Sequence, residues 1–93
     1  MQRIKIENTE RHALAALAFL SGGSRFIIII CHGFRGVKEN SGKLYAFADR
    51  LQELGAGVYA FDFWGSGESD GEFAHMTLTS QARDLAGVID YVF

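Results

Sequence analysis

Two loops in this 93-residue chain carry residue types that could act on a carbonyl carbon. The first, His32-Gly33-Phe34-Arg35-Gly36, follows an apolar, β-branched run typical of a buried parallel strand, and open α/β sheets place their binding crevices at that end of a strand. A sharp turn at the glycine would aim the Phe34 N–H into the crevice, where it could stabilise the oxyanion formed during acyl transfer. Phe34 is therefore the candidate catalytic group, and His32, Gly33 and Arg35 are candidates for substrate binding. The alternative is an ordinary connection between strand and helix, in which His32 makes local hydrogen bonds.

The second loop runs from residue 62 to residue 71 and reads Asp-Phe-Trp-Gly-Ser-Gly-Glu-Ser-Asp-Gly. Its glycines indicate tight turns. The aspartate at its start is expected to accept hydrogen bonds from backbone N–H groups of the turn. The residues assigned a structural role in this loop are Asp62, Gly65, Gly67, Ser69 and Gly71.

Ser69 lies within Gly-Glu-Ser-Asp-Gly, which fits the G-x-S-x-G pattern of a serine nucleophile elbow. An elbow places its serine at an abrupt turn between a buried strand and a helix. Here the strand is expected to end near Phe63, and residues 72–76 delay the next helix, so Ser69 lies in the middle of a polar loop. We therefore interpret Ser69 as a turn residue that hydrogen-bonds nearby backbone groups.

The histidines offer no convincing base for Ser69. His75 could be paired with it, oriented by Asp70 or Asp84, but the chain order of an elbow-type site is nucleophile, then acid, then histidine, with the last two well beyond the elbow. We interpret His75 as a surface loop residue and His12 as a turn residue.

Local geometry also argues against a thiol site and a dinucleotide site. Cys31 adjoins His32, but neighbouring residues on an extended strand point to opposite faces, so their side chains do not meet. Gly65 and Gly67 could begin a G-x-G-x-x-G loop, but Asp70 occupies the third glycine position and would put a carboxylate where the pyrophosphate belongs. No cofactor is expected, and with one cysteine no cysteine-based metal site.

The elements that must position these loops are visible as patterns. Residues 2–7 alternate between apolar and polar types, as in a half-buried strand. Residues 13–20 are rich in Ala and Leu, which by propensity alone would suit a short helix. The continuous apolar run at residues 26–31 predicts a strand covered on both faces in the centre of a sheet, and residues 57–63 predict a second buried strand.

Two helices are predicted from helical spacing. The first begins after Ser41 as N-cap and ends at Gly55, and the second is capped by Thr77 or Thr79. The expected buried faces are Leu44, Phe47, Ala48, Leu51 and Leu54 in the first helix, and Ala82, Leu85, Val88, Ile89 and Val92 in the second. Strand, helix and strand in this order predict a right-handed βαβ unit.

Composition limits the class of protein. With 48% hydrophobic and 22% charged residues, the chain is globular, and its length allows a single domain, residues 1–93. A net charge of −2 makes nucleic acid and membrane surfaces poor partners. The single cysteine suits a reducing compartment, and the longest aliphatic run, residues 27–30, is far too short to span a bilayer. A cytoplasmic location is expected.

Taken together, His-Gly-Phe after one strand and Asp-x-x-Gly-x-Gly-x-Ser-x-Gly after the next resemble the α/β-hydrolase superfamily over essentially the whole chain. The likeness is greatest to the branch of feruloyl (cinnamoyl) esterases, because Gly-Glu-Ser-Asp-Gly-Glu-Phe at residues 67–73 and Met76-Thr77 extend the match. Acylglycerol lipases, thioesterases and serine aminopeptidases share much of the pattern. The resemblance implies that residues 13–20 form a strand hairpinned to residues 2–7.

The resemblance also implies an incomplete site. The expected fold is the N-terminal portion of an α/β-hydrolase sheet, an antiparallel hairpin followed by strand, helix, strand and helix, truncated before the strand that leads to the nucleophile elbow. The nucleophile, acid and histidine are then expected beyond residue 93, so residues 1–93 alone are expected to be inactive. One hypothesis is a piece of a serine hydrolase for small acyl esters. The other is a non-catalytic module that self-associates or binds a complementing chain along the open edge of strand 26–31.

Overall fold

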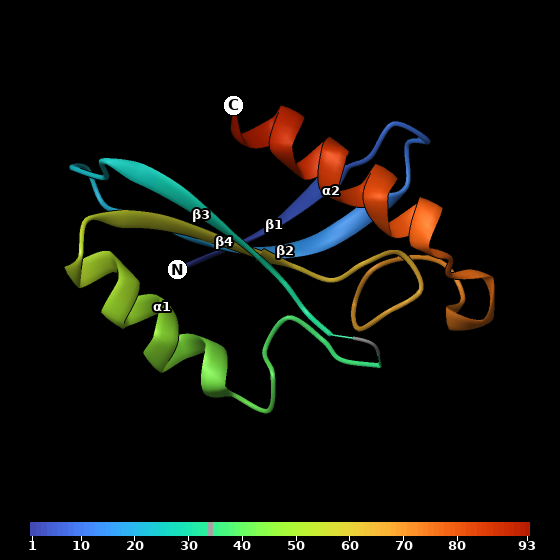
Figure 1. The fold of residues 1–93 in the computed structure, drawn as a ribbon, viewed down its shortest axis with the longest axis horizontal. Coiled ribbons are helices and arrows are strands. Elements are labelled where there is room, and N and C mark those ends of the chain that lie inside the picture. Colours follow the sequence, from blue (N-terminus) through green and yellow to red (C-terminus); the bar gives the residue numbers. More distant parts are fainter. Residues whose placement is uncertain (34) are drawn as a thin grey trace.

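A computed structural model describes residues 1–33 and 35–93, which form one four-stranded sheet with a helix on each face. In Figure 1, α1 (Lys43–Glu53) lies below the sheet and α2 (Leu78–Val92) lies above it. The strand order is β1-β2-β4-β3. This arrangement is the predicted α/β fold, and it brings the loops that follow β3 and β4 to the same end of the sheet (Figure 1).

The N-terminal hairpin is formed by β1 (Gln2–Glu7) and β2 (Ala13–Phe19), which pair antiparallel with Gln2 opposite Ala18 and Glu7 opposite Ala13. The second strand ends one residue earlier than expected. Its Ala- and Leu-rich sequence forms a strand because β1 pairs with one edge and β4 with the other, and because residues 14–19 are all buried. Tertiary pairing and burial outweigh the helix propensity of these residues.

The parallel pair consists of β3 (Phe26–Cys31) and β4 (Ala56–Phe61). The expected strand 57–63 is shifted, since β4 ends at Phe61 and leaves the next two residues in the following loop. Within the described residues, β3 pairs with β4 alone and lies at the edge of the sheet, so its four isoleucines are only partly buried. Within the described residues this strand is therefore not covered on both faces at the sheet centre, as its apolar run alone indicates, but forms the open edge expected of the truncated sheet.

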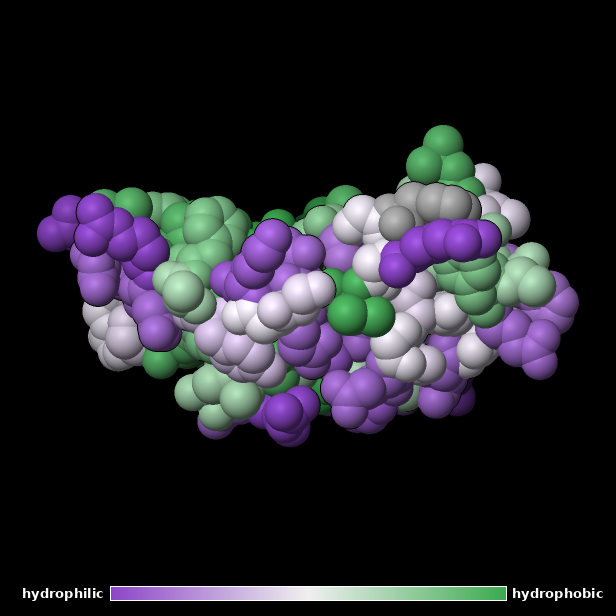
Figure 2. All heavy atoms as spheres, turned by 90° about the horizontal axis from the view of Figure 1, so that it is seen from below, coloured by the Kyte–Doolittle hydropathy of each residue, from purple (hydrophilic) through white to green (hydrophobic). Residues whose placement is uncertain are grey.

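Helix α1 packs over β2 and β4. Its N-cap is Gly42, with φ of 83°, and not Ser41, which itself adopts a left-handed φ of 56° in the preceding turn. Leu44 and Ala48 are buried, but Phe47 and Leu54 are 56% and 64% exposed, contrary to the predicted face. In the view from below, hydrophilic and hydrophobic side chains are intermixed on the surface (Figure 2).

Helix α2 follows a short 3₁₀ turn, η1 (Phe73–His75), and begins with a capping box in which Thr77 and Ser80 exchange side chain-to-backbone hydrogen bonds of 3.0 and 2.9 Å. Thr77 is therefore the correct one of the two predicted caps. The inner face centres on Asp84, Gly87 and Val88, whereas the predicted core residues Ala82 and Ile89 are exposed. The buried face of α2 is thus rotated about the helix axis relative to the predicted face. Gly87 lies against the hairpin turn, where an added Cβ would lie 2.8 Å from Asn8 Cα.

The described residues form two core clusters, one on each face of the sheet. The cluster under α1 contains Leu17, Phe19, Leu44, Ala48, Ala56, Val58 and Ala60. The cluster under α2 contains Ile6, Leu14, Ala16, Phe61, Phe63 and Val88. Ala56, Val58 and Ala60 of β4 enter the cluster under α1, whereas Phe61 at its end enters the cluster under α2, so this strand contributes to both clusters and fixes the start of the loop that follows it.

Candidate functional site

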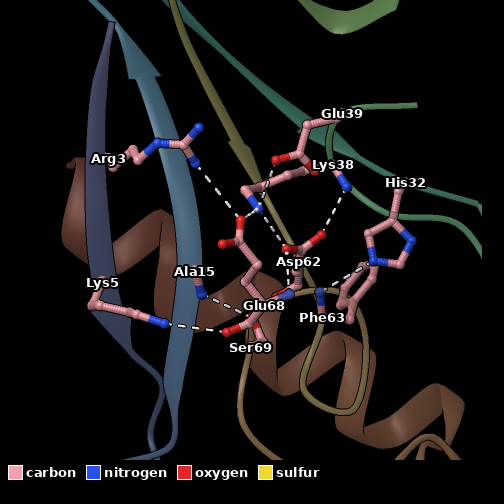
Figure 3. A network of polar contacts seen from close by, with 10 residues as sticks. All are labelled: Arg3, Lys5, Ala15, His32, Lys38, Glu39, Asp62, Phe63, Glu68 and Ser69. Atoms are coloured by element: carbon pink, nitrogen blue, oxygen red, sulfur yellow. Dashed lines mark hydrogen bonds and ion pairs between the residues drawn. The ribbon is translucent and has the colours of Figure 1, made fainter. Parts of the chain in front are cut away.

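The centre of the candidate site is a buried ion pair that sequence reasoning missed. The ammonium of Lys38 lies 2.7 Å from Asp62 Oδ2, 2.9 Å from Glu68 Oε1 and 3.0 Å from Glu39 Oε2. The side chains of Lys38 and Asp62 are 1% and 0% exposed. Figure 3 shows the Lys38 side chain directed toward the carboxylates of Asp62 and Glu68. Burial lowers the pKa of Lys38, but the hydrogen bonds to the three carboxylates outweigh it and hold the pKa above its usual value. Lys38 is therefore a charged structural group, and Glu68, bonded to it, has a lowered pKa.

Asp62 organises both loops. Its Oδ1 accepts the backbone N–H of Lys38 at 2.7 Å, and its Oδ2 accepts the backbone N–H of Glu68 at 3.1 Å. The expectation that this aspartate would bind backbone amides of the glycine turn is thus met, and its bond to the preceding loop is an addition. The carboxylate connects the end of β4 to the loop after β3 (Figure 3).

The glycines of the turn are needed for close approach. Gly65 has φ of 87°, and a Cβ there would lie 2.7 Å from the carbonyl oxygen of Glu72. Gly67, also at positive φ, would place a Cβ against the carboxylate of Asp62, and Gly71, at φ of 93°, would place one against the indole of Trp64. The turn can therefore fold over Asp62 only with glycine at these positions.

Ser69 is engaged on both sides of its hydroxyl. Its Oγ donates to the carbonyl oxygen of Asp62 at 2.6 Å and accepts the backbone N–H of Ala15 at 2.8 Å. It thereby joins the turn to the residue after β4 and to β2, and both of its partners are backbone groups, as expected of a turn serine (Figure 3). None of these partners is a base that could activate the hydroxyl for attack.

His32 makes one local hydrogen bond and one to the loop that follows β4. The backbone N–H of Phe63 donates to its Nε2 at 3.2 Å, so the proton of the neutral ring lies on Nδ1, which faces the carbonyl oxygen of Gly33 at 2.8 Å. The ring also packs edge-on against the Phe63 ring, with centroids 5.0 Å apart. Cys31 is exposed at the end of β3, and partial burial of its thiol raises its pKa, which disfavours the reactive thiolate.

The remaining polar residues of the loops are structural too. Asp84, weighed as an orienter for His75, accepts Asn8 Nδ2 at 2.7 Å and the backbone N–H of Trp64 at 2.8 Å, and so ties α2 to the hairpin turn and to the glycine turn. The rings of His12 and His75 both stack on the Trp64 ring, with centroids 4.9 and 6.5 Å away. In residues 1–33 and 35–93 no cluster of three His, Cys, Asp or Glu side chains could hold a metal ion.

A pocket of about 340 Å³ lies between the two loops. One wall is formed by Arg35, Gly36 and Val37, and the other by Gly65, Ser66 and Gly67, with Phe73 beside them. The guanidinium carbon of Arg35 lies 6.0 Å from the centre of the Phe73 ring, which suits a cation–π contact. A second pocket of about 170 Å³, at the end of β3, is lined in part by His32 and Gly33. The predicted oxyanion donor, Phe34, lies outside the described residues.

Lys38 and Glu68 are the residues of this site that sequence reasoning missed. A lysine next to a glutamate normally indicates a solvated surface, and no periodic pattern marks Lys38 as buried. The one available signal was Asp62 itself, because a carboxylate at the end of a buried strand needs a charged or hydrogen-bonding partner.

These features define an α/β-hydrolase: a mixed sheet in which a polar loop after β3 meets a glycine-rich turn after β4. The sequence comparison is more specific, since residues 22–92 match the family described as serine aminopeptidase, S33. The chain belongs to this family. A curated relative, an uncharacterized 31.7 kDa Escherichia coli protein from the traX-finO intergenic region, is 38% identical over 65 residues, which cover 70% of this chain and 22% of the relative.

Solved structures agree on the fold. Est1E from Butyrivibrio proteoclasticus with ferulic acid bound is 28% identical with a TM-score of 0.81, and the match covers 96% of this chain and 36% of that chain. DcsB in complex with its substrate analogue is 26% identical with a TM-score of 0.83, covering 98% and 31% of the two chains. Mouse alpha/beta hydrolase domain-containing protein 10 is 26% identical with a TM-score of 0.73, covering 100% and 36%. The chain thus spans about a fifth to a third of the length of these proteins.

Proposed function

We propose that this chain is the N-terminal part of a carboxylic ester hydrolase whose serine nucleophile, acid and histidine lie beyond residue 93. The observation that carries the proposal is the pocket of about 340 Å³ between the loops after β3 and β4, at the carboxyl ends of two parallel strands. Membership of the S33 family, the short span of the chain relative to its relatives and the fully bonded Ser69 support it.

In this proposal the chain supplies the oxyanion loop and part of the crevice. A serine from the rest of the protein attacks the ester carbonyl carbon as its hydroxyl proton passes to the histidine, and the carbonyl oxygen becomes an oxyanion that accepts the backbone N–H of Phe34. Collapse of this intermediate breaks the ester C–O bond, and the alkoxide takes the proton from the histidine and leaves as the alcohol. Water, deprotonated by the same histidine, then attacks the acyl-serine and releases the carboxylic acid, and the histidine returns the proton to the serine. His32 and Gly33 position the loop, since the His32 ring is bonded to Phe63 and Gly33.

The substrate would be a small acyl ester bound beside Arg35. Val37 and Phe73 provide apolar surface, and Arg35 lies at the pocket with its guanidinium near the Phe73 ring. Because Est1E binds ferulic acid and its sequence is 28% identical to this one, esters of aromatic acids are the first candidates, followed by acylglycerols, thioesters and peptides.

The proposed place of action is the cytoplasm, because a single cysteine suits a reducing compartment. The described residues include no helix long and apolar enough to cross a membrane.

Two substitutions of Phe34 test the oxyanion assignment in the protein at its full natural length. Phe34→Pro removes the proposed N–H donor, whereas Phe34→Leu retains it. Loss of one such donor lowers kcat by about 10² to 10³, or about 2.7–4 kcal/mol, so the proline variant should fall that far on methyl ferulate or p-nitrophenyl acetate while the leucine variant stays near wild type. Both variants must first show unchanged thermal unfolding. Near-normal kcat in a folded Phe34→Pro protein would refute the oxyanion role and show that the loop is an ordinary connection between strand and helix.

A further inference from the structure

The two walls of the pocket are joined by one side chain. Lys38 directly follows the wall formed by residues 35–37, and Glu68 directly follows the wall formed by residues 65–67. The Lys38 ammonium bonds Glu68 Oε1 at 2.9 Å and Asp62 Oδ2 at 2.7 Å, so it connects the far ends of both walls (Figure 3).

Asp62 makes this connection bidentate. Its Oδ1 holds the backbone N–H of Lys38 at 2.7 Å while its Oδ2 holds the ammonium of the same residue at 2.7 Å. The same Oδ2 accepts the backbone N–H of Glu68 at 3.1 Å. One carboxylate therefore fixes the backbone at the end of both walls. Because this carboxylate is buried from solvent, the Lys38 ammonium compensates its negative charge.

The lysine is poorly suited to the other roles that a cation near such a pocket could take. Three carboxylates surround its ammonium, so little positive charge remains to stabilise an oxyanion. A buried ion pair also adds little net stability compared with well-packed apolar residues, because desolvation cancels much of the attraction. What the pair does supply is a fixed geometry between two loops.

We propose that Lys38 is a positioning residue that sets the width of the pocket between residues 35–37 and residues 65–67, and so the fit of the acyl group. The inference rests on the proposed function for its substrate, but the spacing of the walls is a property of the described residues alone. Outside the pocket, Arg3 lies 3.7 Å from Glu68 Oε1 and Lys5 Nζ donates to the Glu68 carbonyl oxygen at 3.2 Å, which holds the second wall from the side of β1.

The test uses the protein at its full natural length and the variant Lys38→Met, which keeps much of the side-chain volume and removes the charge. Lys43→Met is the matched control, because Lys43 is an exposed lysine at the start of α1. Hydrogen exchange read by mass spectrometry should rise at least tenfold in peptides covering residues 35–38 and residues 65–69 in Lys38→Met, while peptides from β2 keep their protection. The control should change neither.

Kinetics supply the second readout. A misplacement of about 1 Å in a positioning group can cost about 10²-fold, so Lys38→Met should lower kcat/KM for methyl ferulate about 10- to 100-fold and for p-nitrophenyl acetate much less, because a small acyl group depends less on pocket width. Lys38→Arg, which restores a buried cation, should recover part of the loss. Equal losses on both esters would overturn the proposal.

If Lys38→Met does not fold, the double variant Lys38→Met/Asp62→Asn removes the two fully buried charges and leaves only the partly exposed carboxylates of Glu39 and Glu68 without the lysine. It must show the same local rise in exchange at both walls, and unchanged exchange there would also refute the inference. The exchange result does not require ester hydrolysis. Local loosening in a protein that hydrolyses no ester would overturn the proposed function and support the positioning role, whereas unchanged exchange in an active esterase would do the reverse.

Discussion

Replacing Ser69 by Ala separates a turn serine from a nucleophile. In the structure its hydroxyl accepts the backbone N–H of Ala15 at 2.8 Å and donates to the carbonyl oxygen of Asp62 at 2.6 Å, and Ala15 is only 6% exposed. The substitution leaves a buried N–H without its acceptor, which costs about 1–3 kcal/mol, because water cannot easily replace the hydroxyl. We therefore expect Ser69→Ala to lower the free energy of unfolding by that amount, measured by urea titration.

The same variant has an equally clear kinetic expectation. Loss of a true serine nucleophile lowers kcat by about 10⁶, whereas a turn residue leaves turnover largely intact while the protein stays folded. Hydrolysis of p-nitrophenyl acetate by the full-length protein, assayed well below its unfolding midpoint, distinguishes these results. Ser21→Ala, in an exposed turn, is the control and should change neither quantity. Unchanged stability together with abolished turnover would refute the assignment of Ser69 as structural.

Three further predictions concern the turn and the sheet edge. Because bonding to Lys38 lowers the pKa of Glu68, the stabilisation by this ion pair is present above the ordinary glutamate pKa of about 4.3 and is lost as pH falls through the lower folded value. The unfolding temperatures of Glu68→Gln and wild type should therefore differ at pH 7 and converge in acid. A difference that stays constant with pH would contradict a stabilising Lys38–Glu68 ion pair. Gly71→Ala, which combines positive φ with a clash against Trp64, should lower stability by at least about 2 kcal/mol in urea titrations, while Gly22→Ala, which meets open space, should have little effect. Residues 1–93 expressed alone should self-associate through β3 and should not hydrolyse p-nitrophenyl acetate above background, and size-exclusion chromatography that found a compact, cooperatively unfolding monomer would contradict the self-association.

The parts of the fold with regular sequence patterns were predictable. The alternation of residues 2–7 and the apolar run at residues 26–31 predicted strands with the observed bounds, and one of the two candidate caps, Thr77, is the start of α2. The β2 strand could not be assigned from its residues alone, because Ala and Leu favour a helix and only pairing with β1 and β4 decides otherwise. Helix faces were less accurate, since Phe47, Leu54 and Ile89 lie at the spacing of a buried face but are exposed in the structure.

The candidate site also contains residues that the sequence predicted and one that it did not. Short motifs with glycines and a strand-end carboxylate located both loops and the role of Asp62, because turn chemistry is local. The partner that completes the site, Lys38, comes from a loop 24 positions earlier in the chain and looks like a surface residue. Its burial depends on how the loop after β3 crosses the end of β4, which only the assembled sheet determines.

The hydrogen bond between Asn8 and Asp84 has a consequence for synthesis on the ribosome. These residues are 76 positions apart, and at about 5–20 residues per second the second is made about 4–15 s after the first. Until then the turn between β1 and β2 lacks its buried carboxylate partner, and β2 waits for β4 to occupy its second edge. A nascent chain would therefore expose the apolar residues of the N-terminal hairpin for seconds, until β4 and α2 are made and cover them.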